Sequence, residues 1–373
     1  MPLKNQHYVP RVYLKSWETT VYSKREPNKP FQGVYKFENN DFETGDGITK
    51  ENVLSENHTY TIDFQHTFII QFCPQVRDDF GAKIDAILKQ RNVYVLLGST
   101  ALNTYSLLGE NLNMLDKWML YSHATGQPIS PKNEKAIKNQ IRDIRSYVLE
   151  DAFSAKVENS WTKTMKGFIG DVQKSLPDKA NYNLRKISVE SAMHMVEMTF
   201  YMAFRNPEFD CLGVYSAISN TLFNVLANGT EDVEKKCQWQ SLSNQMHHGM
   251  WLTEISKALF HQKGAFQKLC IETCKRCKII LFEVETAEQG QFITSDNPSF
   301  WYNNCLEREN HNGIYFPLSP QHLLLFAQGN DGDISTIDYR TVRNRDIRTL
   351  NRIIANSSIK TIVSNCKHLG FIL

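Results

Sequence analysis

The stretch QFITSDNPSFWYNN (residues 291–304), followed by GIYFPLSP (313–320), decides the fold of the C-terminal part of the chain. Its apolar runs Gln291–Ser295 and Ile314–Leu318 predict two strands. Each run leads into a polar turn closed by proline, Ser295–Pro298 in the first case and Ser319-Pro320 in the second. Polar groups held at strand ends can face a ligand, and the same residue types also form tight turns without one.

The sequence around this stretch predicts more short strands, punctuated by Gly, Asn and Asp. They are Ile279–Glu285, Leu323–Gln328, Ser335–Ile337, Lys360–Ser364 and Leu369–Leu373, with one helix expected over Tyr339–Asn356. Short strands with close connections favour a mostly antiparallel sheet in this region.

The middle of the chain has helical periodicity. From about Phe64 to Lys263 apolar residues recur at spacings of three and four, as at Phe80, Ile84 and Leu88. Further helices are expected over Leu112–Ser122, Pro131–Ser175, Ser188–Arg205, Leu212–Ala227 and Leu242–His261. Pro131 after Ser130 is typical of a capped helix start, and Pro177 and Pro207 predict helix ends.

The N-terminal part is rich in aromatic residues and is expected to pack into the body. Val21-Tyr22 and Gly33–Phe37 predict a β-hairpin, and His58–Ile62 predicts a short extended run. The fold class is therefore α+β: a largely helical middle, a C-terminal mostly antiparallel sheet and an N-terminal β-hairpin. One intertwined domain over 1–373 is predicted, with an arm and hairpin (1–63), a helical region (64–277) and a sheet region (278–373).

Composition excludes several classes of protein. The 373 residues carry 42 Lys+Arg against 40 Asp+Glu, so no global field draws the chain to nucleic acid or membrane. A local basic face remains an option at Arg340, Arg343, Arg345, Arg348 and Arg352. No secretory signal opens the sequence and no apolar run is long enough to span a bilayer. Eight cysteines without an export signal indicate reduced thiols. A cytoplasmic, globular protein with no membrane partner is expected.

Three cysteines, Cys270, Cys274 and Cys277, have a spacing that could hold a metal. It resembles the iron–sulfur spacing of radical S-adenosylmethionine enzymes, although too little chain follows to build their barrel. As zinc ligands they would need a fourth partner, with Cys305 or His311 nearest in sequence. The favoured interpretation is that positions i, i+4 and i+7 lie on one helix face as small core residues. The His247-His248 pair and His194 are interpreted as structural, because no HExxH motif is present.

Five residues form the candidate catalytic set: His7, Arg11, Arg205, Asp296 and Asn297. Histidine can shuttle protons, a carboxylate can orient it or hold a metal, and arginine can grip an anion. This combination suits phosphate-ester chemistry, with the cofactor unknown and a divalent metal as one option. Taken singly, each residue has a structural alternative: a tether at His7, a helix-end cation at Arg205 and a turn former at Asp296. GxSxG, P-loop and GxGxxG motifs are absent.

The same residues carry a family resemblance. Gln6–Lys15 (QHYVPRVYLK) resembles the opening QHYVPxxYLxxF of the domain of unknown function 4238 family, with Trp17 where that family tends to have phenylalanine. Arg205–Pro207 resembles its RTP helix end, Phe292–Pro298 its FITSDNP and Phe316–Pro320 its FPLSP. The resemblance spans almost the whole chain. It implies no reaction, but it marks His7 and the Asp296 turn as hallmark positions that are expected to meet in one site.

The leading hypothesis is a hydrolase or nuclease-like effector acting on a phosphate-containing substrate, in a setting such as bacterial anti-phage defence. Its partner would be a nucleic acid or nucleotide. The rival hypothesis is a non-catalytic interaction or sensor protein, with a protein partner or a second copy of the chain, in which the motifs are structural. A zinc-stabilised binding module using the three cysteines is the third.

Overall fold

A computed structural model describes residues 5–38, 41–57, 74–206, 209, 221, 224, 247, 249–261, 264–303, 312–329 and 333–370. The chain forms two compact units between which it alternates. Unit 1 consists of Met1–Thr59, Ser154–Phe209 and Ala265–Leu373, and unit 2 of Tyr60–Phe153 and Asp210–Gly264. The predicted single intertwined domain is not tested by this division and stays a prediction.

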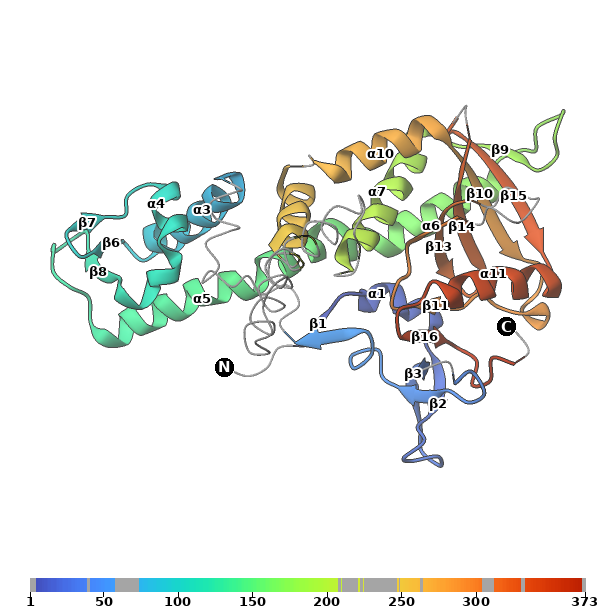
Figure 1. Cartoon of the computed structure of the whole chain (residues 1–373), viewed down its shortest axis with the longest axis horizontal. Helices are drawn as coiled ribbons and strands as arrows, with labels where there is room; N and C mark the ends of the chain where they lie inside the picture. Colours follow the sequence, from blue (N-terminus) through green and yellow to red (C-terminus); the bar gives the residue numbers. More distant parts are fainter. Residues whose placement is uncertain are drawn as a thin grey trace. The chain divides into compact units, whose positions relative to one another are not determined.

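Unit 1 is built on a six-stranded sheet (Figure 1). Its strands, in spatial order, are β12 (Phe300–Tyr302), β13 (Gly313–Ser319), β14 (His322–Gln328), β10 (Cys277–Val284), β15 (Thr336–Val342) and β9 (Leu184–Lys186). All neighbours are antiparallel except β10 and β15, which run parallel. The α+β class with a mostly antiparallel C-terminal sheet is confirmed.

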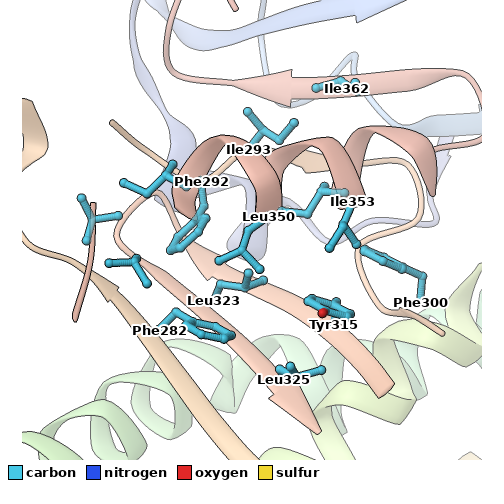
Figure 2. Packing of buried hydrophobic residues seen from close by; sticks show 14 of the residues in the cluster. Phe282, Phe292, Ile293, Phe300, Tyr315, Leu323, Leu325, Leu350, Ile353 and Ile362 are labelled. Atoms are coloured by element: carbon cyan, nitrogen blue, oxygen red, sulfur yellow. The ribbon is translucent and has the colours of Figure 1, made fainter. Parts of the chain in front are cut away.

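Both faces of the central strands are covered, which explains why β13 is buried along its whole length. On one face Tyr315 packs in an apolar cluster with Leu350 and Ile353 of helix α11 (Asn344–Asn356), as Figure 2 shows. On the other face the ring of Phe316 lies 5.6 Å from that of Trp161 in helix α6 (Asn159–Lys174). Alternate residues of a strand point to opposite faces, so a continuous apolar run such as IYFPL fits a sheet covered on both sides.

A second sheet in unit 1 joins the two ends of the chain. It contains β11 (Thr294–Ser295), β16 (Thr361–Ser364), β3 (Pro30–Glu38), β2 (Thr19–Tyr22) and, on β3, β4 (Asp46–Ile48). The antiparallel pair β2–β3 confirms the predicted hairpin. A further pair that the sequence did not predict joins β1 (Asn5–His7) to β5 (Ser55–Asn57).

Short helices complete unit 1. They are α1 (Arg11–Leu14), the 3-10 helices η1 (Lys15–Trp17) and η5 (Ala287–Gln289), the π-helical turn η3 (Ser154–Glu158), α7 (Val189–Arg205) and α10 (Ala265–Arg276). Helix α7 begins where the hydroxyl of Ser188 accepts a hydrogen bond from the amide of Ser191, which is a standard N-cap. The predicted helix from Ser188 to Arg205 is confirmed.

Unit 2 combines helices with a small sheet. Its helices are α3 (Pro74–Gln90), α4 (Tyr105–Glu110), the 3-10 helix η2 (Leu112–Lys117), α5 (Pro131–Phe153) and the π-helical turn η4 (Lys257–His261). Its antiparallel strands are β6 (Val93–Leu97), β7 (Thr100–Ala101) and β8 (Met119–Ser122). Helices α3 and α4 approach closely at two glycines: a Cβ on Gly81 would lie 1.9 Å from the carbonyl oxygen of Tyr105, and one on Gly109 2.4 Å from that of Arg77.

Several sequence-based boundaries are wrong. The helix expected over Leu112–Ser122 ends at Lys117, because Met119–Ser122 pairs with β6 instead. The helix expected from Tyr339 starts at Asn344, because Tyr339–Val342 extends β15 beside β10. Only Thr294 and Ser295 of the first apolar run are in a strand, since the amide of Phe292 bonds the carbonyl of Pro320.

Some predictions fall outside the described residues. They concern the extended run His58–Ile62, the helix end at Pro207, most of the helix Leu212–Ala227, the start of the helix Leu242–His261 and the end of the strand Leu369–Leu373. Within the described part of the chain, no helix is both long and apolar enough to cross a membrane.

Candidate functional site

In unit 1 the N-terminal arm, residues 5–17, contacts two motifs from the C-terminal part of the chain, Phe292–Pro298 and Phe316–Pro320. The hydroxyl of Tyr13 donates to the carbonyl of Pro317 at 2.7 Å and lies 2.7 Å from the hydroxyl of Thr294. The indole of Trp17 donates to the carbonyl of Phe292 at 3.0 Å. Both rings are fully buried, and burial raises the pKa of Tyr13 far above its ordinary value. The arm is therefore part of the core, as predicted.

Arg205 at the end of α7 holds the arm at His7. Its Nε donates to the carbonyl oxygen of His7 at 2.9 Å, and its Nη1 is 2.5 Å from Oε1 of Glu158. Only 1% of Arg205 is exposed. A buried guanidinium needs an anionic partner and filled donors, and Glu158 with the His7 carbonyl supplies both.

His7 is buried and surrounded by positive charge. Desolvation lowers its pKa to about 4, and the charges of Arg11 and Arg205 act in the same direction. Glu158 and a hydrogen bond with the backbone of Val53 oppose this shift without cancelling it. The imidazole is therefore neutral at neutral pH. Arg11, in contrast, is exposed.

The carboxylate of Asp296 is enclosed by backbone amides. Its Oδ1 accepts from the amide of Ile359 at 2.8 Å, and its Oδ2 accepts from Lys360 at 2.7 Å and Thr361 at 2.9 Å. Burial raises the pKa of Asp296, while these three hydrogen bonds lower it. The side chain is 3% exposed and fixes the loop that enters β16.

Asn206 links the two halves of this network. Its Nδ2 lies 3.2 Å from the carbonyl oxygen of Asp296 and 3.3 Å from Oδ1 of Asn297. Asn297 in turn donates from its own Nδ2 to the carbonyl of Ser357 at 3.1 Å. Since Asn206 directly follows Arg205, one helix end bonds the arm on one side and the Asp296 turn on the other.

We call His7, Glu158, Arg205, Asn206, Asp296 and Asn297 the motif clasp. The structure brings four of the five predicted site residues into it, and Arg11, which is exposed, acts on His7 only through its charge among the interactions described. The Asp296 carboxylate bonds the two amides before β16 and the first amide of β16, so its contacts are those of a loop anchor. The catalytic roles assigned to these residues stay predictions.

Glu158 and Asn206 are the two members that were not among the predicted site residues, and Glu158 is the one that lies outside every motif. It ends the π-helical turn η3, and such turns often occur at functional or strained positions. Nothing in its local sequence distinguishes it from the other charged residues of a helical stretch. The usable signal is indirect: a buried arginine requires a carboxylate, and that partner becomes known only with the fold.

The three cysteines do not share one helix face. Cys270 and Cys274 lie on α10, but Cys277 is the first residue of β10, so the helical interpretation is wrong for Cys277. Burial raises the pKa of all three thiols, that of Cys277 to about 11. Among the described residues no group of three or more His, Cys, Asp or Glu side chains is placed to hold a metal ion. The proposed fourth ligands, Cys305 and His311, lie outside them.

With this geometry established, comparison with known proteins assigns the family. The model of the family described as "Protein of unknown function (DUF4238)" matches residues 5–368. The chain belongs to this family, and the match covers nearly its whole length, as the motifs predicted. Comparisons with curated proteins and with solved structures gave no match.

Proposed function

We propose that this chain is an interaction or sensor protein in which the motif clasp is structural. The observation that carries this proposal is the state of Asp296: both carboxylate oxygens are engaged by the amides of Ile359, Lys360 and Thr361. A carboxylate that binds a metal or orients a histidine needs an oxygen lone pair that faces the metal ion or the imidazole. A buried carboxylate whose two oxygens accept hydrogen bonds from backbone amides is better suited to anchoring a loop than to catalysis.

The surroundings of Arg205 support the same proposal. An arginine that grips a substrate phosphate must present donors to solvent, whereas this one is buried and bonds Glu158 and the His7 carbonyl. The clasp thereby holds together segments far apart in sequence and makes unit 1 a rigid platform. The partner remains a protein, a second copy of the chain, a nucleic acid or a nucleotide, and a cytoplasmic location is part of the proposal.

Phosphate-ester hydrolysis by a nuclease-like effector, in a setting such as anti-phage defence, is the second candidate. One observation favours it: Arg11 is exposed, and its charge reaches the neutral imidazole of His7. A neutral histidine beside an exposed arginine could accept a proton while the arginine holds a phosphate.

Two variants of the full chain, Asp296→Asn and His7→Ala, distinguish these candidates. Each is compared with the wild type by urea unfolding and by hydrolysis of bis(p-nitrophenyl) phosphate in the presence of Mg²⁺ or Mn²⁺. If the clasp is structural, Asp296→Asn is expected to lower the free energy of unfolding by about 1.5–3 kcal/mol, which is the usual contribution of hydrogen bonds to a charged group. The control is Asp151→Asn, which changes an exposed carboxylate on α5. Hydrolysis by the wild type that both variants lose, with unfolding midpoints unchanged, would establish the second candidate instead.

A further inference from the structure

The second proline-closed turn, Ser319-Pro320, carries a polar chain that the motif clasp does not use. The hydroxyl oxygen of Ser319 lies 3.0 Å from Nδ1 of His322, and Nε2 of His322 lies 3.2 Å from Oε1 of Glu283. A nucleophile within hydrogen-bond reach of a base, with the base oriented by a third group, is the diagnostic arrangement of an activated serine. We propose that Ser319, His322 and Glu283 form a serine hydrolase site for small carboxylic esters.

The three side chains come from strands whose positions are fixed by the sheet. Ser319 ends β13 and His322 begins β14, and the two residues are paired across the hairpin. His322 is also paired with Glu283 of β10. The register of β13 shifts between Pro317 and Ser319, as in a β-bulge. Bulges re-aim side chains and are frequent next to active sites.

The turn itself is held rigidly. The carbonyl of Pro320 accepts from the amide of Phe292 at 2.8 Å, and that of Gln321 accepts from the amide of Val284 at 2.9 Å. A reacting hydroxyl requires such support, because catalytic geometry tolerates little displacement. The amide of Gln321 donates to the Ser319 hydroxyl oxygen at 3.2 Å and so helps to fix the position of the atom that would react.

Glu283 is positioned by two further side chains. Gln173 of α6 donates to its Oε1 at 2.9 Å, and the hydroxyl of Tyr339 on β15 donates to its Oε2. These contacts direct Oε1 to His322 and favour the tautomer with its proton on Nε2, which leaves Nδ1 free to accept from Ser319. The His322 and Glu283 side chains are partly exposed, at 14% and 24%, and Ser319 is buried with 8% of its surface exposed.

The reaction balances with water as the second reactant. The Ser319 oxygen bonds to the ester carbonyl carbon while its proton moves to Nδ1 of His322. The bond from that carbon to the alcohol oxygen breaks, and the alcohol takes the proton from Nδ1, leaving an acyl group on Ser319. Water then loses a proton to Nδ1 and adds to the acyl carbon, and the proton returns to the departing Ser319 oxygen as the acid leaves. Glu283 takes up no proton in this sequence of steps and acts as a positioning residue.

This inference goes beyond the proposed function and is independent of it, because none of the three residues belongs to the motif clasp. The test uses the full chain with a fluorophosphonate probe and with p-nitrophenyl acetate. We expect labelling of Ser319, identified by peptide mass spectrometry, and loss of labelling in Ser319→Ala. General-base catalysis predicts that His322→Gln lowers kcat/KM by about 10²–10⁴-fold. The matched control is Ser175→Ala, whose hydroxyl donates to the carbonyl of Lys186 rather than to a histidine.

Two further variants distinguish a reacting serine from a turn former. Ser319→Cys keeps a nucleophile and is expected to form an acyl-enzyme with p-nitrophenyl thioacetate, whereas Ser319→Ala is not. Glu283→Gln is expected to change the pH dependence of kcat/KM and not only its magnitude, because the group facing Nε2 loses its charge. Failure of the probe to label the folded wild type, or equal labelling in wild type and Ser319→Ala, would overturn the site. Neither result affects the clasp, whose failure appears in the Asp296→Asn stability measurement.

Discussion

Arg205 donates a hydrogen bond to the carbonyl oxygen of His7 at 2.9 Å, across 198 positions of sequence. The bond joins the end of α7 to the N-terminal arm, and Glu158 neutralises the buried guanidinium that makes it. A motif at the start of the chain and a motif in its middle are thus parts of one contact. The Arg205 side chain is explained by the arm that it holds, before any ligand is invoked.

Replacement of Arg205 by methionine is expected to destabilise unit 1 strongly. The change leaves Glu158 without its cation and the His7 carbonyl without its donor, and breaking a buried ion pair by removing one partner costs about 3–5 kcal/mol. Since Glu158 keeps some contact with solvent, we expect about 3 kcal/mol. Urea unfolding followed by tryptophan fluorescence measures this loss. Arg345→Met, an exposed arginine on α11, is the matched control. Equal midpoints for both variants would show that Arg205 does not hold the arm.

His7 makes stability depend on pH in a defined window. Its pKa is about 4 in the folded chain and is about 6.5 when the chain unfolds, so the unfolded state binds more protons between these values. The contribution of His7 to the free energy of unfolding is fully present above pH 6.5 and is lost as the pH falls towards 4. Linkage gives a loss of about 2 kcal/mol between pH 7.5 and pH 5. His7→Gln is expected to remove this part of the pH dependence when urea unfolding is measured at both pH values.

The control for His7 is His123→Gln, which changes an exposed histidine in unit 2. It should keep the pH dependence of the wild type. A pH dependence in His7→Gln as steep as that of the wild type would mean that the imidazole of His7 is not desolvated in the folded chain.

The fold could be predicted where local pattern and tertiary context agree. The run IYFPL is apolar along its whole length and became a strand covered on both faces, and α7 spans Val189–Arg205, close to the predicted helix Ser188–Arg205. Context overrode the pattern at Tyr339–Val342, which pairs in parallel with β10 although a helix follows directly. Pairing between distant strands is not contained in a local window, which is why that boundary was wrong.

Four residues of the motif clasp were singled out from the sequence, whereas Glu158, Asn206 and the geometry of the clasp were not. The motifs named His7, Arg205 and Asp296, and the structure joins them through Asn206. A sequence shows which polar residues are present, but not which backbone amides will fill a carboxylate. The amides of Ile359 and Lys360 precede β16 and that of Thr361 begins it, and no motif marks these residues, so the partners of Asp296 could not be predicted from the sequence.

Thiol reactivity separates buried cysteines from metal ligands. Burial raises the pKa of Cys270 and Cys277, the latter to about 11, so little reactive thiolate exists near pH 8. Labelling with iodoacetamide, quantified by peptide mass spectrometry, is expected to be about 100-fold slower at Cys277 in the folded chain than in urea. A chelator should leave the native rate unchanged. Faster labelling on addition of a chelator would indicate a bound metal and would favour the interpretation of these cysteines as a zinc or iron–sulfur site.

Two helical glycines with different surroundings test the packing of α3 against α4. A Cβ on Gly81 would lie 1.9 Å from the carbonyl oxygen of Tyr105, which is backbone and cannot rotate away, so Gly81→Ala must push the helices apart. Overpacking of this kind costs about 1–3 kcal/mol. At Gly170 on α6 no atom beyond the adjacent residues and the helix's own backbone lies within 4 Å of the new Cβ, so Gly170→Ala should stabilise by about 0.5–1 kcal/mol through helix propensity alone. The two substitutions are chemically identical, and thermal unfolding should give shifts of opposite sign. A stabilising Gly81→Ala would mean that α3 and α4 do not pack through these glycines.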